Sequence, residues 1–244
     1  MLVTGGSRGI GAATAVSAAQ SGWNVAISYH AKKAAADEIV NRCRDHGVAA
    51  FAQQCEVADE ASVLELFARC DQELGPLGCL VNNAGILFAM SRLEDMDVDR
   101  VRRVTEVNTI GAFLCAREAV RRMATDRGGQ GGSIVNVSSA ASYLGSPNEF
   151  VDYAMTKGAM DTMTIGLAKE VADRGIRVNG VRPGLIDTDI HADAGVPDRV
   201  DRLKDGVPMR RGGTADEVAS LILYLASDGA SYVTGTNVNI AGGR

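Results

Sequence analysis

Short apolar runs alternate along the chain with longer segments whose apolar positions recur every three or four residues. Apolar runs bounded by glycine or polar clusters predict buried strands, and the longer spacing predicts amphipathic helices. Strands are expected at residues 2–3, 23–29, 49–55, 77–82, 133–138, 176–182 and 238–240. Helices are expected at residues 10–21, 32–46, 63–74, 98–123 and 151–174, with a last helix opened by a capping box at residues 214–217.

Strands that alternate with helices predict right-handed β-α-β units and a parallel sheet covered by helices on both faces. The expected fold class is α/β, a Rossmann-type doubly wound parallel sheet of about seven strands. No linker, charge block or low-complexity stretch divides the chain, so residues 1–244 are expected to form a single domain. The first strand is very short, so we expect residues of the native chain to precede Met1.

Composition and charge argue against several classes of function. The formal net charge is −5 and the basic residues do not cluster, which argues against nucleic acid as a partner. The apolar run at residues 221–226 is too short to span a bilayer, and no signal peptide precedes Thr4, so we expect a cytoplasmic protein that does not bind membranes. The five cysteines and three histidines are scattered, which favours reduced thiols and no metal site.

A glycine-rich loop, T-G-G-S-R-G-I-G, joins the first strand to the first helix at residues 4–11. A loop in this position directs backbone N–H groups and the positive end of the helix dipole at one point, which suits a phosphate. Its spacing, G-x-x-x-G-x-G, departs from the common G-x-G-x-x-G fingerprint. Tight turns also use glycine, so this loop alone leaves both a phosphate site and a plain turn open.

Tyr153 and Lys157 are spaced i, i+4, which places both side chains on one face of the helix expected at residues 151–174. A neighbouring ammonium favours the phenolate and lowers the pKa of tyrosine from its usual value near 10, so the phenol can act as an acid or a base. An isolated Y-x-x-x-K pattern also fits two ordinary surface residues. The other motifs of the chain therefore decide whether this Y-x-x-x-K pattern is catalytic.

Six motifs occur in a fixed order along the chain. They are T-G-x-x-x-G-x-G, N-N-A-G at residues 82–85, V-N-x-x-G-x-F at 107–113, a strand ending in Ser138-Ser139, Y-x-x-x-K at 153–157 and P-G-x-x-x-T at 183–188. This set resembles the short-chain dehydrogenase/reductase family across essentially the whole chain. The stretches N-N-A-G-I-L, G-S-P-x-E-x-V-D-Y-A and I-x-T-x-I-H-A resemble a bacterial glucose-dehydrogenase-like or 3-oxoacyl-reductase-like subgroup, a label that does not establish a substrate.

The resemblance implies a role for each candidate catalytic residue. Tyr153 matches the catalytic acid/base, and Lys157 matches the residue that lowers its pKa and holds the nicotinamide ribose. Ser139 matches the residue that hydrogen-bonds the substrate oxygen. Ser138 competes for that role, but Ser139 is closer to the family's usual spacing, which implies a one-residue loop insertion. Asn108 matches the position that helps to hold a water for proton relay.

The implied cofactor is a nicotinamide dinucleotide, with NADP(H) preferred and NAD(H) as the alternative. Where a carboxylate would hold the ribose of NAD, this chain has Tyr29, and Arg8 in the glycine loop is suited to bind a 2′-phosphate. The alternative interpretation is that Arg8, Lys32 and Lys33 are solvated charges on the surface. Glu56 stands where the family commonly has Asp. The implied contacts are Gly5, Ser7, Arg8, Gly9, Ile10, Gly11, Tyr29, His30, Lys32, Glu56, Val57, Asn83, Ala84, Gly85, Tyr153, Lys157, Pro183, Gly184, Ile186 and Thr188.

The resulting prediction is an NADP(H)-dependent oxidoreductase that interconverts a carbonyl and a secondary alcohol on a small molecule. A 3-oxoacyl thioester reductase, a glucose or other sugar dehydrogenase, and a non-catalytic NADP(H)-binding regulator are the alternatives. Substrate identity is expected to depend on residues 86–93, 144–151 and a polar lid at 185–213, where His191 is a candidate contact. The resemblance also implies a homotetramer packed through the helices at 98–123 and 151–174 and the C-terminal region.

Overall fold

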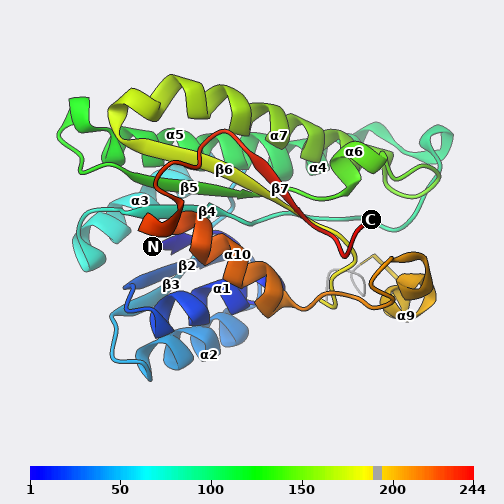
Figure 1. Ribbon diagram of the computed structural model, residues 1–244, viewed down its shortest axis with the longest axis horizontal. Coiled ribbons are helices and arrows are strands. Elements are labelled where there is room, and N and C mark those ends of the chain that lie inside the picture. Colours follow the sequence, from blue (N-terminus) through cyan, green and yellow to red (C-terminus); the bar gives the residue numbers. More distant parts are fainter. Residues whose placement is uncertain (189–193) are drawn as a thin grey trace.

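A parallel sheet forms the centre of the computed structural model, which describes residues 1–188 and 194–244 (Figure 1). Its strands follow the order β3-β2-β1-β4-β5-β6-β7. They are β1 (Leu2–Val3), β2 (Val25–Tyr29), β3 (Ala50–Gln54), β4 (Cys79–Asn82), β5 (Gly132–Val137), β6 (Ile176–Pro183) and β7 (Asn237–Ile240). Every neighbouring pair is parallel, so the predicted doubly wound sheet is confirmed.

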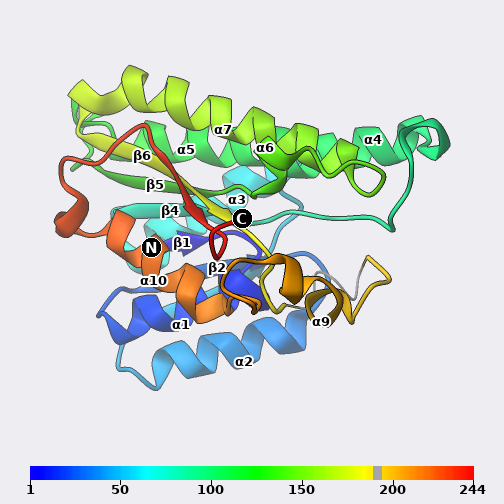
Figure 2. The same ribbon diagram turned by 45° about the vertical axis from the view of Figure 1, so that its right-hand side comes forward.

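Helices cover both faces of this sheet. They are α1 (Gly9–Gln20), α2 (Lys33–Arg44), α3 (Glu60–Leu74), α4 (Val98–Thr105), α5 (Ala112–Met123), α6 (Ala141–Leu144), α7 (Val151–Val171), α9 (Arg199–Leu203) and α10 (Ala215–Ala226). Short helical turns add η1 (Leu93–Asp95), η2 (Glu106–Gly111), η3 (Thr125–Arg127), η4 (Ala172–Arg174), η5 (Lys204–Gly206) and η6 (Asp228–Ala230). Figures 1 and 2 show α1, α2 and α10 on one side of the sheet, and α5 and α7 on the other. Among the residues described, none of the helices combines the length and apolar character that a bilayer crossing requires.

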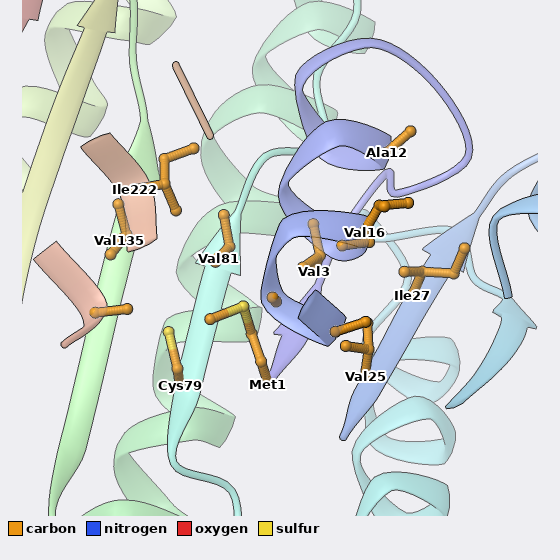
Figure 3. Close-up of a cluster of buried hydrophobic side chains, with 14 of the residues drawn as sticks. Met1, Val3, Ala12, Val16, Val25, Ile27, Cys79, Val81, Val135 and Ile222 are labelled. Atoms are coloured by element: carbon orange, nitrogen blue, oxygen red, sulfur yellow. The ribbon is translucent and has the colours of Figure 1, made fainter. Parts of the chain in front are cut away.

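Two hydrophobic cores, one on each face, explain why the strands are apolar on both sides. Successive side chains of a strand point to opposite faces. Val3 therefore packs with Val81 and Val135 against α1 and α10, as Figure 3 shows. The neighbouring residues on the same strands, Leu2, Leu80 and Ile134, pack against α3 and α5. This double burial holds the carboxyl ends of the central strands in fixed positions.

The helix expected at residues 98–123 contains an irregularity that its apolar pattern does not predict. It consists of α4, the π-helical turn η2 and α5. A π-helical turn widens the helix by one residue and is frequent at functional sites. Here it contains the buried Asn108, whose amide groups bond outside the helix. The short helix α6 and, within residues 185–213, the short helix α9 were also not predicted.

The last helix begins as its sequence predicts. The Thr214 hydroxyl accepts a hydrogen bond from the Glu217 N–H, and the Glu217 carboxylate accepts one from the Thr214 N–H, which completes the capping box. The two ends of the segment at residues 185–213 lie side by side, because the Gly213 N–H donates to the Leu185 carbonyl oxygen and the Asp187 N–H donates to the Gly213 carbonyl oxygen. Both ends therefore lie beside the carboxyl end of β6.

Candidate active site

The glycine loop forms a tight cradle between β1 and α1. Gly5 and Gly9 adopt left-handed backbone angles, with φ of +65° and +53°, which favour glycine. A Cβ at Gly11 would lie 2.5 Å from both the Gly5 carbonyl oxygen and the Asn83 side-chain nitrogen. The first N–H groups of a helix have no intrahelical partner. The loop therefore places backbone N–H donors at the start of α1, and these residues fit the phosphates of a dinucleotide.

Thr4 and Asn83 join this cradle to the end of β4. The Thr4 hydroxyl accepts hydrogen bonds from the N–H groups of Asn83 and Ala84, both at 3.0 Å. The Asn83 side chain donates to the carbonyl oxygens of Thr4 and Gly5, at 2.9 and 3.0 Å. These contacts cross the point between β1 and β4 where the chain reverses its direction of winding, which is where doubly wound sheets bind ligands.

A pocket of about 310 Å³ opens beside the cradle at the end of β2. Besides Ser28, Ala31, Cys55, Ile86, Arg103 and Val107, it is lined by the predicted cofactor contacts Gly5, Ser7, Arg8, Gly9, Ile10, Tyr29, His30, Lys32, Glu56, Val57, Asn83, Ala84, Gly85 and Thr188. The remaining predicted loop residue, Gly11, is buried behind the cradle instead of facing this pocket.

Glu56 is already paired inside this pocket. Its carboxylate accepts hydrogen bonds from Arg103 and from the Ala58 N–H, and His30 lies 3.4 Å away. Burial acts to raise the pKa of Glu56, but the hydrogen bond from Arg103 and the smaller contributions of Ala58 and His30 outweigh it, so its pKa lies below the usual value. Arg103 was not predicted as a site residue, because its contact joins two elements that are distant in sequence.

A second pocket, of about 430 Å³, lies at the carboxyl ends of β5 and β6. Ser139, Tyr153 and Lys157 all line it, as do Pro183, Gly184 and Ile186. It shares Ile10, Asn83, Gly85 and Thr188 with the first pocket. The two pockets are therefore parts of one groove, with the glycine loop at its centre and the candidate catalytic residues at one end.

Burial dominates the titration of the two candidate catalytic groups on α7. It raises the pKa of Tyr153 to about 12, against a hydrogen bond with Ser139 that lowers it. It lowers the pKa of Lys157 to about 8, while Asp161 opposes this change. The Lys157 ammonium donates to the Val137 carbonyl oxygen at 2.7 Å and lies 5.5 Å from the centre of the Tyr153 ring. The pKa of the phenol is therefore raised, whereas the spacing of the two residues predicts that it is lowered.

The adjacent serines occupy different surroundings. Ser139 lies beside Tyr153 in the pocket, where its side-chain oxygen also accepts a hydrogen bond from the Ala141 N–H at 3.1 Å. Ser138 is buried, and its hydroxyl donates to the Lys157 carbonyl oxygen at 3.2 Å. Ser139 is therefore the serine that faces the phenol, and Ser138 fastens β5 to α7.

Asn108 lies beneath the groove and lines neither pocket. Its side chain bonds both backbone groups of Ile86, at 2.8 and 3.0 Å, and also donates to the Thr156 hydroxyl at 3.2 Å. Thr156 is the neighbour of Lys157 on α7. The amide thus ties the segment after β4 to the helix that carries the candidate catalytic pair, and its expected part in holding a water stays a prediction.

One wall of the second pocket is apolar and is formed by Leu87 and Phe150 beside Tyr153. Ala194 and Val196 pack against these residues without lining the pocket. Arg199 of α9 also lines this pocket; it donates to both carboxylate oxygens of Glu149, at 3.2 and 2.6 Å, and lies over the Phe150 ring.

Other lining residues extend beyond the predicted catalytic set. They are Leu87, Val137, Ser138, Ala140, Ala141, Leu144, Ser146, Pro147, Glu149, Phe150, Leu185, Arg199 and Arg244. Leu87, Leu185, Arg199 and the residues from 144 to 150 fall within the stretches expected to select the substrate. Arg244 gave no signal in the sequence. The candidate contact His191 lies outside the described residues.

Residues 5–244 match a family model described as enoyl-(acyl carrier protein) reductase. The chain is 55% identical over 243 residues to the uncharacterized oxidoreductase YgfF of Escherichia coli, covering 100% of this chain and 98% of that protein. It is 36% identical to the 3-oxoacyl-[acyl-carrier-protein] reductase FabG of Staphylococcus aureus, covering 99% and 96%. The structure of a Burkholderia cenocepacia short-chain dehydrogenase in complex with NADP is 33% identical, with a TM-score of 0.91 and coverage of 99% and 96%.

These similarities agree with the parallel sheet, the glycine cradle and the groove that ends at Tyr153. The chain belongs to the short-chain dehydrogenase/reductase family. It is an oxidoreductase of the kind that works with a nicotinamide cofactor, and the family predicted from the six motifs is confirmed.

Proposed function

We propose that this protein is an NADP(H)-dependent oxidoreductase that interconverts a carbonyl compound and its secondary alcohol. The observation that carries the proposal is the meeting of Ser139, Tyr153 and Lys157 in one pocket that is continuous with the glycine cradle. A non-catalytic regulator has no need for an acid/base group, an oxygen-binding hydroxyl and a buried ammonium at the end of a dinucleotide groove. In this proposal residues 1–244 are one catalytic domain, and residues 185–213 act as its lid.

The nicotinamide cofactor, when bound, supplies or accepts the hydride. Tyr153 donates its phenolic proton to the carbonyl oxygen during reduction and takes it back during oxidation. Ser139 donates a hydrogen bond to the same oxygen, which stabilises the negative charge that develops there. Lys157 holds the cofactor ribose, and its positive charge favours the phenolate form of Tyr153. Asn108 helps to hold a water through which the proton reaches solvent.

The end of β2 supports a preference for NADP(H). Arg8, Lys32 and His30 line the pocket there. The carboxylate in that pocket, Glu56, is paired with Arg103 and His30 and follows β3 instead of β2. The basic side chains of Arg8 and Lys32, near the expected position of the adenosine ribose, suit a 2′-phosphate. The related Burkholderia structure contains NADP, which agrees with this preference.

Replacement Arg8→Ala should weaken NADPH binding about tenfold to a hundredfold, since a charge-assisted contact with a phosphate contributes ~1.5–3 kcal/mol. NADH binding should change little. Fluorescence titration of both cofactors measures this difference. Arg42→Ala serves as the control, because Arg42 is an exposed arginine in the last turn of α2 that lines neither pocket. Tighter NADH than NADPH binding by the unaltered protein would contradict the preference.

The substrate class is tested by following NADPH consumption over a panel of carbonyl compounds. The panel holds simple ketones, sugar lactones, a 3-oxoacyl thioester and an enoyl thioester, the last because the matching family model carries that name. We expect turnover of at least one carbonyl compound. The similarity to the Staphylococcus enzyme favours the 3-oxoacyl thioester, and the apolar wall around Phe150 fits an acyl chain. Cofactor binding without any turnover would instead support a regulator.

We further propose a cytoplasmic homotetramer. The outer surfaces of the helical segments at 98–123 and 151–174 carry exposed apolar side chains, among them Ile110, Phe113, Met155 and Ile165. Side chains of this kind gathered on two adjacent helices are typical of a surface that another subunit covers.

A further inference from the structure

Asp161 and Arg182 form an ion pair behind the proposed catalytic site. Asp161 follows Lys157 by one turn of α7, and Arg182 directly precedes Pro183 at the end of β6. The Arg182 Nε donates to the Asp161 Oδ2 at 2.8 Å. The two side chains are 9% and 23% exposed, so solvent screens the pair little. Neither residue lines the groove.

Arg182 connects three segments that carry proposed site residues. It belongs to the strand that leads into Pro183 and Gly184, and it pairs with the helix of Tyr153 and Lys157. Its guanidinium also lies 5.6 Å from the centre of the Tyr143 ring, in the short helix that follows Ser139. One guanidinium therefore fixes the relative positions of the serine segment, the Tyr-Lys helix and the wall of the groove.

Arg182 donates a hydrogen bond to one of the two carboxylate oxygens of Asp161, Oδ2. The Asp161 Oδ1 is buried and receives no hydrogen bond within residues 1–188 and 194–244. Side chains four residues apart lie on one helical face, so the next cation along α7 is Lys157. Lys157 is itself buried and donates to the Val137 carbonyl oxygen. Its pKa is about 8, and Asp161 keeps that value from falling further.

We propose that Asp161 is a positioning residue that holds Lys157 in its charged form at neutral pH, and that Arg182 holds the Asp161 carboxylate and the segments around it in place. This inference rests on the proposed function, because the charge of Lys157 matters for holding the cofactor ribose. The charged or titratable groups that face Lys157 in the described residues are Tyr153 and Asp161 on its own helix. Arg182 on β6 acts through Asp161.

The two partners should act on Lys157 in opposite directions. Asp161→Asn removes the anion and leaves the Arg182 cation, so the ammonium is less favoured and the Lys157 pKa falls. Arg182→Met removes the cation and leaves the carboxylate unpaired, so the ammonium is more favoured and the Lys157 pKa rises. The double variant should give a Lys157 pKa between those of Asp161→Asn and the unaltered protein, because neither the anion nor the opposing cation remains. A merely structural pair would give no such opposite signs.

The titration of Lys157 can be measured without any turnover. The chain has five lysines, so protein with ¹³C-labelled lysine gives few NMR signals, and Lys157→Arg assigns the one that matters. We expect the Lys157 titration to move by about one pH unit to lower pH in Asp161→Asn and by a similar amount to higher pH in Arg182→Met. Equal titrations in all variants, or shifts of the same sign, would overturn the proposal.

Arg182→Met can unfold the protein, because it leaves a buried carboxylate unpaired. In that case Asp161→Asn, which keeps the shape of the side chain, decides the matter on its own. Arg182→Lys keeps the charge and should leave the Lys157 titration within a few tenths of a pH unit of the original. Because the NMR measurement needs no substrate, its failure is distinct from a failure to find a carbonyl that the enzyme reduces.

Discussion

Replacement Tyr153→Phe should lower kcat on the best carbonyl substrate by about 10²- to 10⁴-fold, the range that general acid/base groups contribute. The phenylalanine keeps the ring that packs beside Leu87 and Phe150 but has no proton to give to the substrate oxygen. NADPH binding should remain within about twofold, a small change in free energy, because the ring stays in place. Steady-state kinetics and a cofactor titration on the same preparation measure both effects.

Tyr232→Phe is the matched control for this substitution. Its side chain is fully exposed and lines neither pocket, so its activity should equal that of the unaltered protein. Near-normal turnover in Tyr153→Phe would remove the phenol from the proposed mechanism. The loss should also persist across the accessible pH range, since phenylalanine has no group that titrates.

Replacement Gly11→Ala should weaken NADPH binding about tenfold or more, which corresponds to at least ~1.4 kcal/mol. The added Cβ would lie 2.5 Å from the Gly5 carbonyl oxygen, which is backbone and cannot rotate away. The start of α1 must therefore move off β4 and carry its first-turn N–H groups with it. Isothermal titration with NADPH measures the loss, and the melting temperature shows whether the fold is kept.

The control for that variant is Gly206→Ala in η5, where an added Cβ meets nothing within 4 Å and the backbone angle is not left-handed. Its cofactor affinity should match that of the unaltered protein. Equal affinities in Gly11→Ala and Gly206→Ala would show that the close contact with Gly5 and Asn83 has no bearing on the cofactor.

Local patterns were sufficient for most of the fold. The parallel strands are buried on both faces, so they appear in the sequence as continuous apolar runs between glycine-rich ends. The capping box at Thr214 and Glu217 is equally local, since both partners lie within one helical turn. The π-helical turn was not predicted, because the apolar spacing through Val104 and Val107 continues across it. The side chain of Asn108 within the turn bonds Ile86, which lies 22 residues away, so no local pattern indicates this contact.

The candidate site likewise contains residues that local motifs predict and residues that they do not. Ser139, Tyr153 and Lys157 could be predicted, because their motifs lie at strand and helix ends whose order the topology determines. Arg103 and Arg199 could not, since each meets its partner across about fifty residues of chain: Arg103 lies 47 residues from Glu56, and Arg199 lies 50 residues from Glu149. An arginine at a helix end has the same local pattern whether it faces solvent or pairs with a distant carboxylate.

The π-helical turn has a consequence for anyone who engineers this protein. Deleting one residue between Glu106 and Gly111 would restore regular α-helical bonding from α4 to α5 and improve the helix in isolation. It would also rotate one half of the helix against the other by about a hundred degrees, one residue's share of a turn. Asn108 would then no longer reach Ile86. Such a deletion should therefore lower the melting temperature as well as kcat, because the rotated half of the helix no longer packs its apolar face on the sheet.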